Sequence, residues 1–340
     1  MPDLSFYAQQ GEETSSLIGQ LENGTFVHAS LITGEKGTGK RTFAKLIAST
    51  LLCCAEGEKR PCGKCKDCLM AAGNEHPDMI LIRNGMPIAP DVKKDRTTIP
   101  VNDIREMIRI CSTHTMDGRC RVVLLFDADR MTPQAQNCLL KTLEEPPENT
   151  YFILVTEHPD VLLTTVLSRV RTIRLHPWPD DVIRGILDER GTERNRADEC
   201  VQEARGSIGK ALELAEDEAY WKTRNEIIQD FFGTLKRSDI LRISGKWKDR
   251  RDQAEQLTEV LESIVHNMLE YRFHFPNAGP VSALPKPWQL FADKAGMDRF
   301  SMLADAICDV RRQIASNVNF QAVIEQLLFV IMGEGNKWSA

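Results

Sequence analysis

Residues 34–42 read GEKGTGKRT, a glycine-rich loop that follows a phosphate-binding pattern and departs from it at one position. The full pattern, G-x-x-x-x-G-K-[ST], uses glycines so that backbone N–H groups can surround phosphates, a lysine that reaches the terminal phosphates and a hydroxyl that holds Mg²⁺. Arg41 stands where that hydroxyl belongs, and Thr42 comes one position too late, because each step along a helix turns the side chain by about 100°. The loop therefore predicts a phosphate cradle without its usual metal ligand, built from Gly34, Gly37, Gly39, Lys40 and Thr42.

The segments on either side of the loop support this prediction. Residues 28–33, HASLIT, are a short apolar run of the kind that forms a buried parallel strand. The segment 40–52 has helical periodicity and places on one face Phe43, Leu46, Ile47, Thr50 and Leu51. Strand, loop and helix is the arrangement that the motif requires, so a chance glycine turn is the weaker interpretation.

A second segment with the character of a nucleotide site is RVVLLFDADRM, residues 121–131. Its apolar run, Val122 to Phe126, predicts a central buried strand whose carboxyl end delivers Asp127, and ligands of open α/β sheets bind at such ends. Asp127 is a candidate Mg²⁺ ligand, and an aspartate that merely caps the strand is an equal alternative. An ATPase would place a glutamate next to orient water, but Ala128 follows.

Four cysteines form a more specific cluster than either segment. A C-x-x-C-x-x-C run with a further cysteine upstream supplies four thiolates for a tetrahedral Zn²⁺, and a closed site of this kind is structural. We expect the ligands to be Cys53, Cys62, Cys65 and Cys68, with Cys54 as the alternative to Cys53.

The composition indicates a cytoplasmic protein of more than one domain. A chain of 340 residues is too long for a single core, and its 42% of hydrophobic residues suffice for two or three. Ten cysteines, with neither a signal peptide nor an apolar stretch of membrane length, indicate a reducing compartment and no membrane partner. The net charge of −6 argues against an autonomous DNA-binding protein, since phosphate neutralisation needs a concentrated basic surface.

The pattern of apolar residues along the chain changes at about residue 175. Before that point apolar runs alternate with helical segments, which predicts an α/β domain with a doubly wound parallel sheet. Its remaining strands are expected at 79–82, 122–126, 151–156 and 171–175, and its helices at 101–113 and 133–143. Residues 83–98 are expected to form a surface loop.

The prolines of HPWPDD, residues 176–181, interrupt both helix and strand patterns. We therefore expect three regions. The first is a nucleotide-binding-like domain over 1–175, with a zinc module at 53–68. A small helical lid over 176–214 and an all-α domain over 215–340 follow. In the third region, helices are expected at 218–235, 253–273, 300–316 and 320–332, with a proline-rich interruption at 276–287.

These features together resemble the bacterial replicative clamp loader within the AAA+ superfamily, and most closely its delta-prime subunits. The resemblance covers the first two expected regions, and the third matches only in length and class. The segments that carry it are GEKGTGKRT, the cysteine cluster, HPDMILI (76–82), LLKTLEEPPENTYFILVT (139–156) and LLTTVLSRVR (162–171). The resemblance adds Thr156, at the end of an expected strand, to the candidate nucleotide-binding residues.

The resemblance also separates this chain from the motor subunits of the loader, called gamma or tau. A motor subunit would have Thr at position 41, Glu at 128 and a lid Arg within GSIGKA (206–211), whereas this chain has Arg41, Ala128 and Gly209. Three departures at one nucleotide site imply a subunit without intrinsic ATPase activity. Lys210 follows the position of the missing Arg, so a cationic contact shifted by one residue is an open alternative. Binding of ATP or ADP without Mg²⁺ is a further open alternative.

Ser168 and Arg169 match the first two residues of the Ser-Arg-Cys motif of this family, and Val170 replaces its Cys. The resemblance implies that Arg169 acts in trans, as an arginine finger in the ATP site of a neighbouring motor subunit. Without the resemblance, an ordinary surface salt bridge would be the favoured interpretation of Arg169.

The implied partners are the gamma or tau motor subunits and delta, with the sliding clamp and primer-template DNA reached through the complex, whose DNA polymerase activity resides in other subunits. The alternative is an active ATPase, either a divergent motor or a AAA+ repair ATPase, in which Thr42 supplies the hydroxyl. A third class is a zinc-stabilised DNA-binding module, which the acidic charge and the absence of interleaved basic and aromatic residues disfavour.

Overall fold

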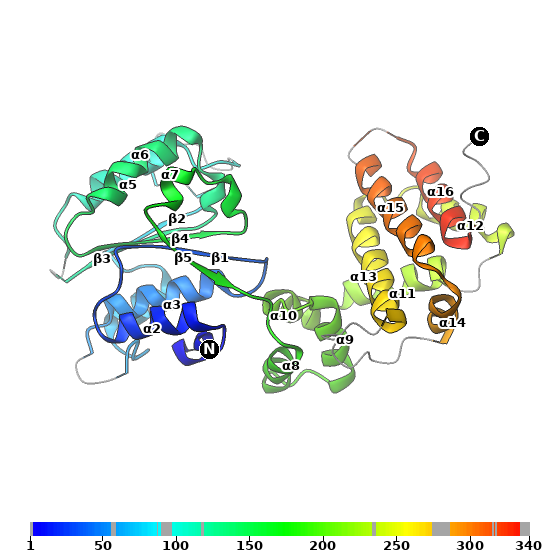
Figure 1. The fold of residues 1–340 in the computed structure, drawn as a ribbon, viewed down its shortest axis with the longest axis horizontal. Helices are drawn as coiled ribbons and strands as arrows, with labels where there is room; N and C mark the ends of the chain where they lie inside the picture. The colour runs from blue at the N-terminus through cyan, green and yellow to red at the C-terminus, as the bar shows by residue number, and fades with distance from the viewer. Residues whose placement is uncertain are drawn as a thin grey trace. The chain divides into compact units, whose positions relative to one another are not determined.

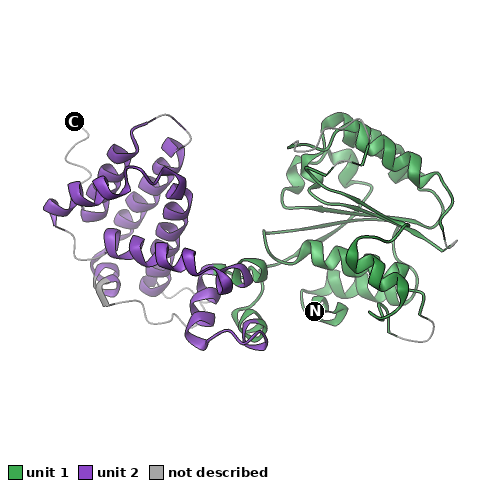
Figure 2. Cartoon of the chain, turned by 180° about the vertical axis from the view of Figure 1, so that it is seen from behind, with its two compact units in different colours: residues 1–186, 204–211 green, residues 187–203, 212–340 purple. Residues whose placement is uncertain are grey.

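The computed structural model describes residues 3–55, 59–86, 88–89, 97–116, 119–232, 236–273, 286–314, 316 and 318–333. The chain divides into two compact units (Figure 2), of which the first comprises Met1–Ile186 with Ala204–Ala211 and the second Leu187–Glu203 with Leu212–Ala340. The expected surface loop at 83–98 and the proline-rich interruption at 276–287 lie largely outside the described residues.

The first unit is built on a five-stranded sheet in which all strand pairs are parallel, in the order β2-β3-β4-β1-β5. The strands are β1 (Ala29–Gly34), β2 (Met79–Ile82), β3 (Arg121–Leu125), β4 (Thr150–Thr156) and β5 (Arg171–Leu175). The predicted strands are all present, and those covered on both faces, such as β3, are the most continuously apolar. β3 is an interior strand between β2 and β4 and is fully buried, as predicted, and the edge strand β5 alternates between buried and exposed residues.

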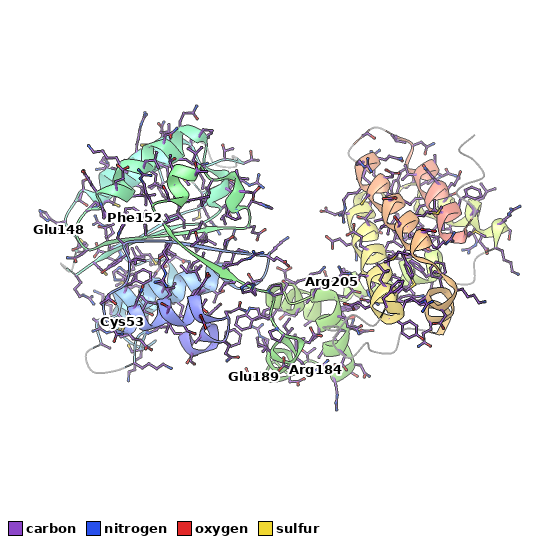
Figure 3. All side chains as sticks on the ribbon, viewed as in Figure 1. Cys53, Glu148, Phe152, Arg184, Glu189 and Arg205 are labelled. Atoms are coloured by element: carbon purple, nitrogen blue, oxygen red, sulfur yellow. The ribbon has the colours of Figure 1, made fainter. Side chains whose placement is uncertain are left out.

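Helices cover both faces of this sheet, with α2 and α3 on one side and α5, α6 and α7 on the other (Figure 1). Phe152 of β4 is almost completely buried within the sheet layer (Figure 3). The helices of this domain are α1 (Leu4–Ala8), α2 (Glu12–Glu22), α3 (Lys40–Leu52), α4 (Lys66–Gly73), α5 (Val101–Cys111), α6 (Pro133–Glu144) and α7 (Thr164–Leu167). Short 3₁₀ turns lie at Ala128–Arg130 and Pro159–Val161.

The ends of α3 and α6 follow from local chemistry. Helix α6 begins where the Thr132 side chain accepts a hydrogen bond from the Ala135 N–H, and Pro133 occupies its first turn, where a missing N–H costs nothing. Helix α3 begins directly after Gly39, which has a left-handed backbone conformation. The phosphate loop and α3 therefore meet at a turn that only glycine adopts easily.

Three lid helices follow β5, as expected for this fold. They are α8 (Asp180–Glu189), α9 (Arg194–Ala204) and α10 (Ile208–Glu216). The two compact units part within this region, so the division of the chain at residues 175 and 214 into three domains stays a prediction.

The rest of the second unit is helical, in agreement with the expected all-α region. Its helices are α11 (Glu218–Phe232), α12 (Arg237–Trp247), α13 (Ala254–Phe273), α14 (Lys286–Lys294), α15 (Met297–Ile314) and α16 (Phe320–Met332), with a 3₁₀ turn at Arg251–Gln253. Their core includes the fully buried side chains of Phe231, Trp247 and Ile264. Among the described residues no helix is both long and apolar enough to cross a membrane.

Candidate functional site

The backbone of the phosphate loop depends on its glycines. Gly34, Gly37 and Gly39 all have positive φ angles, of 149°, 80° and 92°. A Cβ atom on Gly34 would lie 2.4 Å from the backbone oxygen of Leu175 in the neighbouring strand β5. The sequence pattern therefore marks real backbone constraints, because other residues adopt such angles only with strain.

Two aromatic side chains hold the loop from outside. The indole N–H of Trp178, which follows β5, donates to the carbonyl oxygen of Thr38 at 2.9 Å. The hydroxyl of Tyr7 in α1 donates to the carbonyl oxygen of Gly39 at 3.1 Å. Both side chains are almost fully buried, so the loop is fastened to the N-terminal helix and to the segment that leads into the lid.

The first turn of lid helix α10 packs directly against the loop. The Gly209 N–H donates to the carbonyl oxygen of Gly37 at 2.9 Å. A Cβ atom on Gly37 would lie 1.9 Å from the hydroxyl oxygen of Ser207. At the position where the resemblance implies a lid Arg in motor subunits, this chain thus has a backbone contact to the loop itself.

Lys40 is buried, with 6% of its side chain exposed, and its charge is balanced within the chain. Its ammonium group donates to the Glu35 carbonyl oxygen at 2.6 Å and lies 3.3 Å from a carboxylate oxygen of Glu157, at the end of β4. Burial lowers the pKa of Lys40, and Glu157 opposes that shift. Glu157 was not among the predicted site residues, although its position directly after a buried strand is a signal that could have identified it.

Arg41 and Asp127 form an ion pair across the site. One guanidinium nitrogen of Arg41 lies 2.5 Å from a carboxylate oxygen of Asp127, and the guanidinium also lies 5.7 Å from the ring centroid of Phe126. Asp127 has a left-handed backbone, which orients its side chain as the strand ends, and the next residue, Ala128, is a buried methyl group.

Thr42 and Thr156, two further candidates, do not share this ion pair. Burial raises the pKa of Tyr7, and the Thr42 side chain opposes that shift by hydrogen bonding to its hydroxyl. The Thr156 hydroxyl donates to a carboxylate oxygen of Asp129 at 2.6 Å and accepts from the His158 N–H at 3.0 Å. The structure therefore brings Arg41 to Asp127, whereas the Thr156 hydroxyl bonds to Asp129 and His158.

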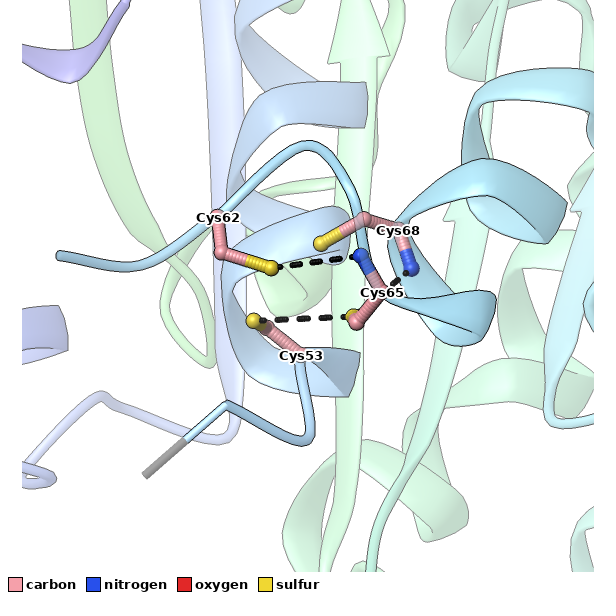
Figure 4. A group of neighbouring side chains, drawn as sticks. All are labelled: Cys53, Cys62, Cys65 and Cys68. Atoms are coloured by element: carbon pink, nitrogen blue, oxygen red, sulfur yellow. Dashed lines mark hydrogen bonds between the residues drawn. The ribbon is translucent and has the colours of Figure 1, made fainter. Parts of the chain in front are cut away.

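The four predicted cysteines converge on one point beside α3 and α4 (Figure 4). The sulfur atoms of Cys53, Cys62, Cys65 and Cys68 all lie within 4.8 Å of one another. The Cys53 and Cys65 sulfurs are 3.9 Å apart, close to the roughly 3.8 Å that a tetrahedron of Zn–S bonds of about 2.3 Å requires. Cys54 is exposed and groups instead with Cys65 and Asp67, so Cys53 completes the four-sulfur set.

The surroundings favour the thiolate form of Cys65, whereas burial raises the pKa of the Cys68 thiol, which a metal ion would have to offset. Backbone N–H groups of Cys65 and Cys68 donate to the sulfurs of Cys62 and Cys65, each at 3.4 Å. Burial opposes ionisation of Cys65, but the N–H groups of Cys68 and Cys54 lower its pKa to about 6. These residues therefore fit a metal ion held by four thiolates.

A partly buried ion pair ties this cysteine module to the rest of the domain. The guanidinium of Arg119 donates to Asp67 at 2.5 Å and to the carbonyl oxygen of Leu52 at 3.0 Å, which joins α4 to the end of α3. His76 also faces Asp67, at 3.6 Å. No local pattern predicts this network, because its members are far apart along the chain.

Ser168 and Arg169 follow α7 on the surface of the sheet domain. The Arg169 side chain, 32% exposed, forms an ion pair with Glu144 at the end of α6. It also donates to the Thr165 carbonyl oxygen at 2.8 Å and to the Ser168 hydroxyl at 3.1 Å. Val170, at the position of the missing Cys, is buried. Arg169 therefore forms the surface salt bridge that was the alternative interpretation of its sequence. Its side chain is partly exposed, so a partner protein can reach it.

Comparisons with known proteins agree on one family. The sequence model described as "DNA polymerase III, delta subunit" matches residues 9–179. A Yersinia pestis protein described as DNA polymerase III subunit delta' is 30% identical over 340 residues, covering 96% of this chain and 95% of that protein. The protein of the same description from Bacillus subtilis (strain 168) is 26% identical, covering 93% of this chain and 94% of the relative.

Relatives described as tau or gamma/tau match a smaller part of the sequence. DNA polymerase III subunit tau of Escherichia coli (strain K12) is 31% identical over 208 residues, which cover 59% of this chain and 31% of tau. Among solved structures, a gamma subunit-related protein from Thermotoga maritima aligns with a TM-score of 0.48 at 16% identity, over 95% of this chain and 100% of that one.

The geometry of the four sulfurs predicts which cysteines retain metal. Elemental analysis of the purified chain should find one metal ion per chain, and Cys65→Ser should lose it and lower the melting temperature, because metal binding and local folding are coupled. Cys54→Ser is the matched control and should keep both. Loss of metal in Cys54→Ser with full retention in Cys53→Ser would contradict this ligand set.

Proposed function

This chain belongs to the delta-prime family of bacterial DNA polymerase III subunits, and we propose that it is a clamp-loader subunit that does not hydrolyse ATP. In this proposal it supplies Arg169 to the ATP site of a neighbouring motor subunit and helps load the sliding clamp onto primed DNA. The observation that carries the proposal is the Arg41–Asp127 ion pair, a guanidinium paired with the strand-end carboxylate that an ATPase uses for Mg²⁺.

The other members of the nucleotide site support the same conclusion. Ala128 offers no carboxylate to orient water, Gly209 contributes a backbone N–H rather than a guanidinium, and Lys40 already has Glu157 as a partner. Hydrolysis needs a positioned metal, an oriented water and stabilisation of the phosphate charge, and each of these is weakened here.

The alternative, an active motor or a AAA+ repair ATPase, requires Thr42 to replace the usual hydroxyl. Arg41 already pairs with Asp127, the carboxylate that such a metal site would need. A motor role would therefore need rearrangement of this ion pair. We retain the non-hydrolysing role as the better supported one.

We propose that the metal is Zn²⁺ and that its role is structural. Four thiolates form a closed tetrahedral site that leaves no position for water, and such sites stabilise loops rather than perform chemistry. The module joins the end of α3 to α4, so the ion would hold a loop of the sheet domain in place.

The proposed partners follow from the family and from the helical second unit. Relatives described as tau or gamma/tau match 59% and 54% of this chain, which supports neighbouring motor subunits of related sequence. We propose that helices of residues 215–340 contribute to assembly as a collar, and that delta, the sliding clamp and primer-template DNA are reached through the complex. Such a replication factor would work in the cytoplasm.

The nucleotide site predicts that the isolated chain turns over ATP no faster than its Lys40→Ala variant, because metal, water and phosphate contacts are all altered. Phosphate release measured with Mg²⁺ over a range of ATP concentrations checks this. Robust turnover that Lys40→Ala abolishes would contradict the proposed role and favour the active ATPase.

The surface position of Arg169 predicts that Arg169→Ala folds and joins the loader but lowers its DNA-stimulated ATP hydrolysis and clamp loading. Arginine fingers in trans are worth about 10³ to 10⁵ in rate in GTPases, and a motor with several sites should lose less when one is affected. Lys should rescue poorly, since it lacks the planar fork of donors. Arg174→Ala, an exposed arginine of β5, is the matched control, and normal turnover with Arg169→Ala would rule out the trans-acting role.

A further inference from the structure

Arg169 does not extend freely from the surface of this chain. Its Nε and one terminal nitrogen both donate to a single carboxylate oxygen of Glu144, the former at 2.8 Å. Its other terminal nitrogen donates to the Thr165 carbonyl oxygen and the Ser168 hydroxyl. These four bonds occupy four of the five N–H groups of the guanidinium.

The contact with Glu144 matters most for a residue that is proposed to bind phosphate. A guanidinium recognises an oxyanion best through two parallel N–H groups along one edge. In this chain the edge formed by Nε and its neighbouring nitrogen is taken by the carboxylate, which also cancels the positive charge. A phosphate that approached this edge would meet a carboxylate of the same sign, so the two anions cannot share it.

We propose that Glu144 is a positioning residue that holds Arg169 in a resting pair, and that the phosphate of a partner subunit's ATP displaces its carboxylate when Arg169 engages. This inference rests on the proposed function of Arg169 and adds the group that controls it. The resting pair would keep the guanidinium folded onto α6 and α7 in the unassembled chain and would make its engagement depend on bound nucleotide.

The exposure of both side chains sets the strength of the resting pair. Glu144 is 49% exposed and Arg169 is 32% exposed, so water screens their attraction. Exposed pairs of this kind shift an equilibrium by about two- to fivefold, which a triphosphate can overcome readily. The resting pair is therefore weak enough for a phosphate to displace Glu144, and its removal should still give a measurable shift in the ATP dependence of hydrolysis.

The test compares variants in the complete loader, assembled with motor and delta subunits, sliding clamp and primed DNA. Glu144→Gln keeps the shape and an acceptor oxygen but removes the charge. It should lower the ATP concentration that gives half-maximal hydrolysis by about two- to fivefold, with the maximal rate within about twofold of wild type. Glu145→Gln is the same change at the next residue, whose side chain forms no ion pair or hydrogen bond with Arg169, and it should leave the half-maximal concentration unchanged.

A double variant shows whether Glu144 acts through Arg169. In an Arg169→Ala background, Glu144→Gln should have no further effect. Three outcomes would overturn the proposed resting pair and leave the role of Arg169 intact. These are an unchanged half-maximal ATP concentration in Glu144→Gln, a fall of its maximal rate to that of Arg169→Ala, and an equal effect of Glu144→Gln in both backgrounds. Wild-type hydrolysis by Arg169→Ala would instead overturn the proposed function, and the resting pair with it.

Discussion

An ion pair between Arg41 and Asp127 joins the two segments from which a phosphate-loop ATPase builds its metal site. The guanidinium is permanently charged and attached to the chain, so it balances the carboxylate with no ion from solution. The neighbouring positions are consistent with this arrangement. Lys40 is balanced by Glu157, and the lid approaches close enough for the Gly209 N–H to reach the carbonyl oxygen of Gly37.

The chain has two arginines that form partly exposed ion pairs at different sites. Arg41 pairs with a carboxylate of the chain's own nucleotide site, whose loop is held by Tyr7, Trp178 and the first turn of α10. Arg169 lies on another part of the sheet domain and pairs with Glu144. In the proposed loader, the first arginine stabilises this subunit without metal, and the second remains available to a neighbour's phosphate.

The sequence predicted the elements that local pattern determines and missed those that need tertiary contacts. The parallel strands were found because runs such as 122–126 are apolar throughout, and α16 was found to the residue. Helix α12 was missed although Ile240, Ile243 and Trp247 lie at helical spacing, and α14, which begins at the end of the expected proline-rich interruption, was also missed. The cysteine set and the loop glycines were predictable from spacing. The partners Glu157, Ser207 and Glu144 were not, because they come from distant parts of the chain.

The most direct test of this account is an electron cryo-microscopy structure of the complete loader with a non-hydrolysable ATP analogue and Mg²⁺. The account predicts that the Arg169 guanidinium lies about 3 Å from a phosphate oxygen bound to a neighbouring motor subunit, while Arg41 stays on Asp127 in this chain. Mg²⁺ and nucleotide coordinated by Asp127 and Thr42 of this chain, with Arg169 still paired to Glu144, would contradict it.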